Sequence, residues 1–394
     1  MKHGWQIGWL LPALMLAAFL GNLALCFMPE GFLSFRTWEP ALSVLGSDSP
    51  GPFEPNLFLV KRKAYGDLAS LGNFPGLREE HDEEFRSDKF GYRNSYGADT
   101  VRSAGIVVGD SFVSASSVPA DKTLSGQLTT LDGGYYYNAG GFPPPGPDAI
   151  ESLLSKLIIP SGTVVFVLLE RRARSAPPSL DSTSSTLPPL KLGPFVVRGR
   201  ALRIWSRLFG DSSPAAILSR KIFRRIQNDV LQPNIYKEEV VRRTLQNNDE
   251  MLFYPADIDP VSDVQTPSIE WSSYLKTFAN RMATHNLRTI VLLVPNKYTV
   301  YGPVLKSVPV QAIGERLMTA IQNELSKAGV PAVNVTSVYL SDAENGLSQK
   351  HYLYWRDDTH WNANGIGVAA NQILPCIQAL RKPVAVSGAR PCGL

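Results

Sequence analysis

Three runs of apolar, largely β-branched residues constrain the fold of this chain more than any other feature. They span residues 104–109, 162–169 and 288–294, and a polar or glycine-containing segment follows each run. Runs of this kind are typical of strands that are buried on both faces of a parallel sheet. Further strands are expected within 133–141 and 331–339, and amphipathic helices at 122–131, 148–158, 268–287 and 313–329. Strands that alternate with helices predict an α/β fold with a central parallel sheet.

The first 30 residues predict a membrane anchor. Trp9–Met28 is a run of 20 residues without a charge, which is about the length that crosses a bilayer as a helix. Lys2 precedes this run and favours an N-terminus that stays in the cytoplasm. A cleaved signal peptide is the alternative, but the small residues of a cleavage site are missing. We therefore expect an uncleaved anchor, with the rest of the chain outside the cytoplasm.

The remaining residues divide into a polar segment and one large domain. Residues 31–102 are expected to form an extended linker and N-terminal extension, and residues 103–394 the α/β domain. A segment that begins rich in Ser, Pro and Thr predicts an insertion at about 174–250. Cys376 and Cys392 lie close together near the C-terminus. In an oxidising compartment we expect them to form a disulfide bond.

The charge distribution argues against nucleic-acid binding. The net charge is only +4, and the densest basic segments, 196–207 and 219–227, are interpreted as solvated helix faces. Contact with an anionic polymer or a lipid headgroup is the alternative. Aromatic residues do not interleave with a basic stripe, so no nucleic acid is expected. No CxxC pair or His/Cys cluster indicates zinc, and no cofactor or metal is predicted.

The end of the first apolar run carries a candidate nucleophile. Gly109, Asp110 and Ser111 follow the run directly, and ligands of open α/β sheets bind at the carboxyl ends of strands. Ser111 is therefore expected to expose its hydroxyl there, with helix N–H groups close to any developing negative charge. Asp110 is expected to hold the turn by accepting backbone N–H groups. A serine nucleophile also needs a base, usually a histidine with a carboxylate behind it.

His360 has carboxylates two and three positions upstream in the same loop, at Asp358 and Asp357. Among the other four histidines, His81 also has acidic neighbours, but it sits in an acidic run that is expected to be exposed to solvent. An Asp in this loop can reach Nδ1 of His360, which leaves Nε2 to take a proton from Ser111. The alternative is a loop histidine whose hydrogen bond to a neighbouring acid is structural only.

The two candidate segments together resemble the SGNH/GDSL hydrolase superfamily. The resemblance rests on the GDSF sequence at 109–112 and the Asp-x-His sequence at 358–360. It implies a flavodoxin-like three-layer SGNH hydrolase fold in which Ser111 pairs with an Asp and His360. Residues 137–150 resemble the second superfamily block, whose glycine supplies an oxyanion N–H, and the matching residue is Gly140.

Further segments are similar to the alginate O-acetyltransferase branch, the AlgX/AlgJ-like periplasmic proteins. They are residues 33–42, 90–94, 294–303 and 357–365. The spacing of this branch assigns the acid of the triad to Asp358, whereas the general superfamily spacing assigns it to Asp357. We prefer Asp358. In the alginate enzymes the Asp-His pair precedes the serine, whereas here the serine comes first, as in ordinary SGNH hydrolases.

Residues near the expected strand ends are candidates for oxyanion or substrate binding. Where the third superfamily block has an Asn, this chain has Glu170, Arg171 and Arg172. Arg171 is therefore a candidate second oxyanion donor, with a salt bridge to Glu170 as the alternative. Lys297 and Tyr301 are expected to contact acceptor hydroxyls or carboxylates unless they are ordinary surface residues. Trp361 is expected to hold the catalytic loop or to provide a platform for sugar stacking.

The resemblance implies an extracytoplasmic O-acetyltransferase that acts on an exported polysaccharide through an acyl-serine. It also implies a single-pass protein of the bacterial inner membrane with its catalytic domain in the periplasm. A multi-pass membrane-bound O-acyltransferase would then be the partner that supplies the acetyl group. One alternative is an SGNH-type carbohydrate esterase or deacetylase, and another is a non-catalytic polysaccharide-binding scaffold.

Overall fold

A computed structural model describes most of the chain after residue 49. The described residues are 12–13, 16–24, 50–72, 74–142, 144–178, 190–192, 195–197, 218–219, 222, 240–258, 263–307, 313–381 and 392. No helix within these ranges is long and apolar enough to cross a membrane. Much of the expected anchor at Trp9–Met28 lies outside the described residues, and those that are described there are helical. The anchor therefore stays a prediction.

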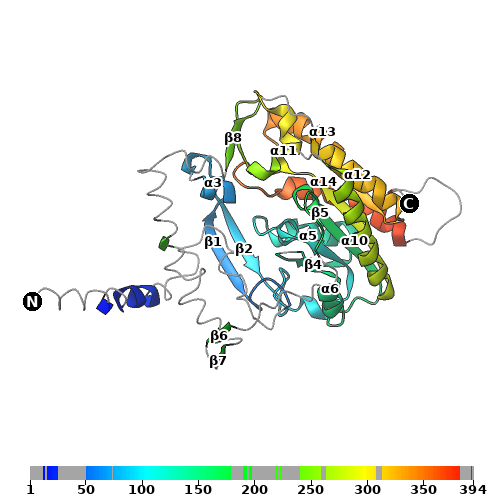
Figure 1. The fold of residues 1–394 in the computed structure, drawn as a ribbon, viewed down its shortest axis with the longest axis horizontal. Helices are drawn as coiled ribbons and strands as arrows, with labels where there is room; N and C mark the ends of the chain where they lie inside the picture. Colours follow the sequence, from blue (N-terminus) through cyan, green and yellow to red (C-terminus); the bar gives the residue numbers. More distant parts are fainter. Residues whose placement is uncertain are drawn as a thin grey trace, which may run out of the picture.

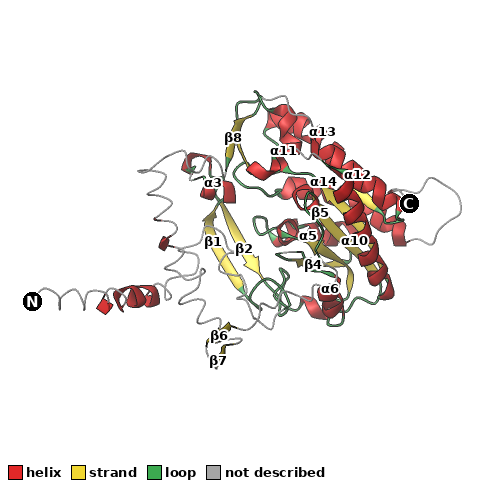
Figure 2. Ribbon diagram, viewed as in Figure 1, coloured by secondary structure: helices red, strands yellow, loops and turns green. Residues whose placement is uncertain are grey.

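Five parallel strands form the central sheet (Figures 1 and 2). They are β3 (Ser103–Gly109), β4 (Tyr135–Gly140), β5 (Gly162–Leu169), β10 (Leu287–Val294) and β11 (Ala332–Asn334). Their order across the sheet is β11-β10-β5-β3-β4. Read from β4 to β11 and numbered by position in the chain, the order is 2-1-3-4-5. This is the flavodoxin-like order, in which the direction of strand addition reverses between β3 and β5. The predicted α/β fold with a parallel sheet is confirmed.

Helices cover both faces of the sheet because its strands are apolar on both sides. Val107 and Val165 face one hydrophobic cluster, and Ile106 and Val164 face another. The first cluster includes residues of α5 (Leu124–Asp132), α11 (Lys297–Tyr301), α13 (Thr336–Gly346) and α14 (Ala363–Arg381). The second includes residues of α6 (Pro147–Leu154), α10 (Gln265–Thr284) and α12 (Ile313–Lys327). The result is a three-layer domain.

The segment before the sheet forms defined elements that contact the C-terminal half of the chain. Strands β1 (Phe58–Ala64) and β2 (His81–Arg86) pair antiparallel, and α3 (Asp67–Leu71) lies between them in sequence. Figure 1 shows this unit beside the α/β domain. The turn into α3 is in close contact with the loop at Asp357, since a Cβ on Gly66 would lie 2.1 Å from the Asp357 carbonyl oxygen. Only a glycine allows this approach.

Two short antiparallel pairs lie within or directly after the predicted insertion, among the described residues. One joins β6 (Leu190–Leu192) to β7 (Phe195–Val197), and the other joins β8 (Val241–Thr244) to β9 (Glu250–Phe253). Met251 and Phe253 of β9 are buried in the first hydrophobic cluster, on one face of the sheet.

Cys376 and Cys392 form the disulfide bond that was expected from their positions. Cys376 belongs to α14, so the bond attaches the C-terminal tail to the last helix of the domain.

Candidate active site

Ser111 begins a short helix at the carboxyl end of β3. Strand β3 ends at Gly109, and α4 spans Ser111–Ser114. Asp110 caps this helix, because its Oδ1 accepts the Phe112 N–H at 3.0 Å. The expected structural role of Asp110 is therefore confirmed. The N–H of Ser111 is in the first turn of α4, where a helix offers no internal acceptor. The turn thus presents a hydroxyl and an N–H group at the same edge of the sheet.

His360 and Asp358 complete a hydrogen-bonded row with Ser111. Nε2 of His360 lies 2.8 Å from Oγ of Ser111, and its Nδ1 lies 2.6 Å from Oδ1 of Asp358. The same Asp358 oxygen accepts the His360 backbone N–H at 2.9 Å. A carboxylate only accepts hydrogen bonds, so Nδ1 carries the hydrogen and Nε2 is the acceptor for the serine hydroxyl. This is the arrangement of a nucleophile, a base and an orienting acid.

Asp357, the alternative acid, points away from His360. Its Oδ2 accepts the N–H groups of Gly66 at 2.7 Å and Glu79 at 2.9 Å. Burial raises the pKa of the Asp357 carboxyl to about 6, and the charge of neighbouring Asp358 adds to the effect. The geometry therefore favours Asp358 as the partner of His360, and Asp357 joins the catalytic loop to the N-terminal segment.

The structure corrects the expected binding roles of Lys297 and Tyr301. Lys297 is fully buried, and its ammonium donates to the carbonyl oxygens of Leu252, Arg356 and Asp358 at 2.7, 3.0 and 3.0 Å. Burial lowers the pKa of Lys297 to about 8. Tyr301 is also buried, and its hydroxyl accepts the Leu353 N–H at 2.8 Å. Neither side chain reaches an acceptor sugar, because the residues past β10 turn inwards and hold the loop that carries His360.

Trp361 holds the catalytic loop and cannot stack on a sugar. It is fully buried, and its indole N–H donates to the Phe112 carbonyl oxygen at 2.9 Å. Its ring also packs against the ring of Phe112, with centroids 5.5 Å apart. Trp361 follows His360 in the chain and Phe112 follows Ser111, so this hydrogen bond links the two catalytic segments. Because Trp361 is buried, the alternative in which it stacks on a sugar is wrong.

Gly140 serves the site through its lack of a side chain. Its N–H donates to the Asn138 side-chain oxygen at 3.0 Å. Because this N–H already has an acceptor within the protein, the expected role of Gly140 as an oxyanion donor is not supported. A Cβ at this position would lie 2.4 Å from the Ser114 backbone nitrogen. Glycine therefore lets β4 approach the helix that carries Ser111.

The Phe-Gly-Tyr-Arg-Asn segment at 90–94 stabilises the chain that directly follows Ser111. The buried guanidinium of Arg93 donates to the carbonyl oxygens of Ser114 and Val118 at 2.8 and 2.6 Å, and also to that of Ala115. These carbonyls end α4 and the following turn, so Arg93 fixes the path of the chain after the nucleophile. Asn94 bonds the backbone N–H and C=O of Asn138 on β4.

Arg171 lies beyond the end of β5, the strand next to β3. Its Nε and one terminal nitrogen donate to the two carboxylate oxygens of Asp257 at 2.6 and 2.7 Å. Its guanidinium lies over the ring of Tyr254, 4.7 Å from the centroid. The salt-bridge partner is therefore Asp257, whereas Glu170 pairs with Arg174. Burial acts to lower the pKa of Arg171, but Asp257, Asp67 and Asp110 outweigh it and raise that pKa.

Asp67 and Thr359 belong to the site but were not predicted. Asp67 Oδ2 lies 4.0 Å from Nδ1 of His360 and accepts the Thr359 hydroxyl at 2.8 Å. Asp67 also accepts the Thr359 N–H at 2.9 Å. The sequence around Asp67 is polar and mixed, without a motif, and 292 positions separate the two residues. No signal in the sequence alone could have paired them.

Asp67, Asp358 and His360 are also the group, within the described part of the chain, that could hold a metal ion. One ligand atom from each lies within 4.8 Å of the others. However, Asp358 and His360 already satisfy each other through a 2.6 Å hydrogen bond. Binding of a metal by these atoms would break the row that includes Ser111, so the arrangement fits proton transfer better.

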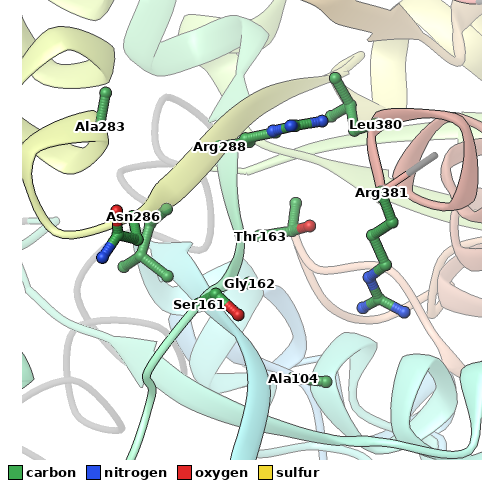
Figure 3. A pocket seen from close by; sticks show the side chains of 10 residues that line it. Ala104, Ser161, Gly162, Thr163, Ala283, Asn286, Arg288, Leu380 and Arg381 are labelled. Atoms are coloured by element: carbon green, nitrogen blue, oxygen red, sulfur yellow. The ribbon is translucent and has the colours of Figure 1, made fainter. Parts of the chain in front are cut away.

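A cavity of about 660 Å³ lies at the opposite end of the sheet (Figure 3). Its lining includes Ala104, Gly162 and Leu287, which stand at the amino ends of β3, β5 and β10. Arg288 and Arg381 also line it, but it contains no nucleophile beside a base. Ser111 and His360 lie at the other end of the sheet, outside this cavity.

Comparison with known proteins supports this site. Residues 245–390 match the family described as the SGNH hydrolase-like domain of the acetyltransferase AlgX. The matched segment contains Asp358 and His360 but not Ser111. No curated protein matches the chain. One solved crystal structure aligns with 71% of this chain and 99% of its own at 11% identity, with a TM-score of 0.31 that does not establish a shared fold. The family match supports an enzyme of the esterase or acyltransferase type.

Proposed function

We propose that this protein is an O-acetyltransferase, because residues 245–390 match the SGNH hydrolase-like domain of the acetyltransferase AlgX. It acts outside the cytoplasm on an exported polysaccharide and forms an acetyl-Ser111 intermediate. The observation that carries the proposal is the hydrogen-bonded row of Ser111, His360 and Asp358. This row lies next to the switch point between β3 and β5, where ligands of such sheets bind.

In the first half of the reaction, Ser111 takes the acetyl group from its donor. Oγ of Ser111 bonds to the acetyl carbonyl carbon while Nε2 of His360 takes the hydroxyl proton. The tetrahedral intermediate then collapses, the bond from the carbonyl carbon to the donor oxygen breaks, and the leaving oxygen receives the proton from His360. Asp358 stabilises the imidazolium that forms between these two steps.

In the second half, a sugar hydroxyl replaces water as the acceptor. The hydroxyl gives its proton to Nε2 of His360 and its oxygen bonds to the acetyl carbon. Ser111 leaves with the proton that His360 returns to it. The products are an acetylated sugar and the free enzyme, so no net proton or electron is gained or lost.

Two groups are proposed to bind the oxyanion of the tetrahedral intermediates. One is the Ser111 N–H at the start of α4. The other is Arg171, which stands two residues beyond the end of β5 as Ser111 stands two residues beyond the end of β3. Asp257 and Tyr254 hold the guanidinium in place before a substrate binds, and preorganised donors of this kind stabilise developing charge.

The compartment and the partners are part of the proposal. The Cys376–Cys392 disulfide supports an oxidising compartment, and the uncharged run at Trp9–Met28 supports an anchor in the bacterial inner membrane. Acetyl-CoA does not occur in the periplasm, so a multi-pass membrane-bound O-acyltransferase is proposed to deliver the acetyl group. The acceptor is proposed to be the polysaccharide during export.

A serine-reactive fluorophosphonate tests the nucleophile. We expect the purified full chain to be labelled at Ser111, and the label to disappear in Ser111→Ala and in His360→Ala. Ser155→Ala and His285→Ala are matched controls, since both residues are exposed and lie away from the site. Labelling of the wild type at another residue, or undiminished labelling of His360→Ala, would contradict the proposal.

Incubation with an acetyl ester and oligosaccharides separates transfer from hydrolysis. Acetylated oligosaccharide that forms with wild-type protein and not with Ser111→Ala supports the acetyltransferase. Free acetate released at the same rate with and without an acceptor would identify an esterase instead.

A further inference from the structure

The N-terminal segment places a second carboxylate close to the imidazole of His360. Asp67 is the first residue of α3, and its Oδ2 lies 4.0 Å from Nδ1 of His360, on the same side of the ring as Asp358. It lies far outside the family match at residues 245–390. The carboxylate is anchored on both sides, because its Oδ1 accepts the N–H groups of Leu68 at 2.8 Å and Thr359 at 2.9 Å.

The hydroxyl of Thr359 links Asp67 to the imidazole. It donates its single hydrogen to Oδ2 of Asp67 at 2.8 Å, and its oxygen lies 3.2 Å from Nδ1 of His360. A hydroxyl has only one hydrogen to give. Since the Asp67 carboxylate takes that hydrogen, the Thr359 oxygen can only accept from Nδ1 of His360. Both groups that face Nδ1, Thr359 and Asp358, are therefore acceptors.

We propose that Asp67 is a positioning residue that acts through Thr359 to keep the hydrogen of His360 on Nδ1. This inference rests on the proposed function, because the Nδ1–H tautomer matters only if Nε2 must take a proton from Ser111. Asp358 favours this tautomer by accepting the Nδ1 hydrogen, but a Thr359 hydroxyl that is released from Asp67 could rotate and offer its own hydrogen to Nδ1 in competition. The Asp67 carboxylate removes this competing hydrogen bond.

The backbone supports the same arrangement. The Asp67 N–H donates to Oδ2 of Asp358 at 3.3 Å, so the backbone of Asp67 is attached directly to the Asp358 carboxylate. The preceding residue, Gly66, donates to Asp357, and the Ala69 N–H donates to the Asp357 carbonyl oxygen at 3.0 Å. The start of α3 is thus attached to the catalytic loop at several points, which fixes Asp67 relative to His360.

Asp67→Asn tests the proposal with little change in shape. An asparagine oxygen can still accept the Leu68 and Thr359 N–H groups, but its NH₂ group cannot accept the Thr359 hydroxyl. That hydroxyl then turns towards Nδ1 of His360. We expect fluorophosphonate labelling of Ser111 to slow by on the order of tenfold to a hundredfold, the range expected when a reacting group is misaligned. Asp82→Asn, on the exposed face of β2, is the matched control.

The tautomer itself is observable in the full chain labelled with ¹⁵N-histidine. The His360 signals are assigned by their loss in His360→Gln. In the wild type we expect Nδ1 to show the shift of a protonated nitrogen, and in Asp67→Asn a mixture of the two tautomers. A purely structural role for Asp67 would leave this signature unchanged.

Thr359 gives an independent test of the link. Thr359→Val removes the hydroxyl, so adding Asp67→Asn to it should slow labelling no further, whereas Thr359→Ser should restore most of the rate. The proposal is overturned if Asp67→Asn labels at the wild-type rate with an unchanged tautomer, or if the effects of Asp67→Asn and Thr359→Val multiply. If Ser111 of the wild type is not labelled at all, it is the proposed function that fails.

Discussion

Asp357→Asn should remove a pH-dependent loss of stability from the folded protein. The Asp357 side chain is completely buried, and its Oδ2 accepts two backbone N–H groups. Its Oδ1 has no hydrogen-bond partner among the described residues. Burial and the adjacent Asp358 carboxylate both disfavour the charged form, which is why the pKa rises from 3.8 to about 6.

The sign and size of the effect follow from this pKa difference. Between pH 3.8 and 6 the folded protein keeps a proton that the unfolded chain releases, so the free energy of unfolding falls as the pH rises through this range. The contribution of Asp357 is fully present below pH 3.8 and is lost above about pH 6. A difference of about 2 pKa units at about 1.4 kcal/mol each gives a loss of about 3 kcal/mol.

Urea unfolding followed by circular dichroism between pH 4 and pH 8 measures this loss. An asparagine at 357 can accept the same two N–H groups but has no charge, so any cost of its buried NH₂ group does not change with pH. The free energy of unfolding of the variant, relative to wild type, should therefore increase by about 3 kcal/mol across the range. Asp82→Asn, with an exposed carboxylate, should follow the wild type closely. Parallel curves for wild type and Asp357→Asn would refute the reasoning.

Three further variants test how the loop and the tail are held. Lys297→Met leaves three buried carbonyl oxygens without their donor, so it should lower the free energy of unfolding by about 3 kcal/mol, at about 1 kcal/mol for each acceptor, and slow labelling of Ser111; unchanged labelling would contradict its positioning role. Gly66→Ala places a Cβ 2.1 Å from the Asp357 carbonyl oxygen and should cost about 1–3 kcal/mol in the same urea assay. Cys392→Ser opens a link across 16 residues and should cost about 3 kcal/mol, an effect that a reductant should reproduce in the wild type.

The core of the site was predictable because two short motifs carry it. A strand that ends in Gly109 followed by Ser111 places a hydroxyl at the carboxyl end of a sheet, and the Asp-x-His spacing places a carboxylate beside His360. The parallel sheet also follows from alternating strands and helices. The choice between Asp357 and Asp358 did not follow from the residues, because neighbouring side chains in a loop point in different directions and only the packing around them decides which one meets the imidazole.

The residues whose roles were predicted wrongly from the sequence were misassigned for one physical reason. Lys297 and Trp361 are residue types that often bind ligands, and both stand near the site. In this fold they are buried, where an ammonium or an indole N–H is equally suited to hold backbone carbonyl oxygens. Sequence position indicates that such a residue is near a strand end or a loop, but whether its side chain turns towards solvent or into the protein depends on the whole fold.

The site is assembled from segments that are far apart in the chain, and each reacting loop is held by residues from another segment. Arg93 holds the turn after Ser111, and Lys297 holds the loop of His360. Asp67, from the N-terminal segment, lies beside the imidazole itself. The 2.8 Å contact between Ser111 and His360 therefore depends on the folding of the chain from the N-terminal strands to α14. The family match at residues 245–390 covers the acid and the base, but that segment alone lacks the nucleophile, the residue that holds its turn and the second carboxylate, and so it cannot carry out the proposed reaction.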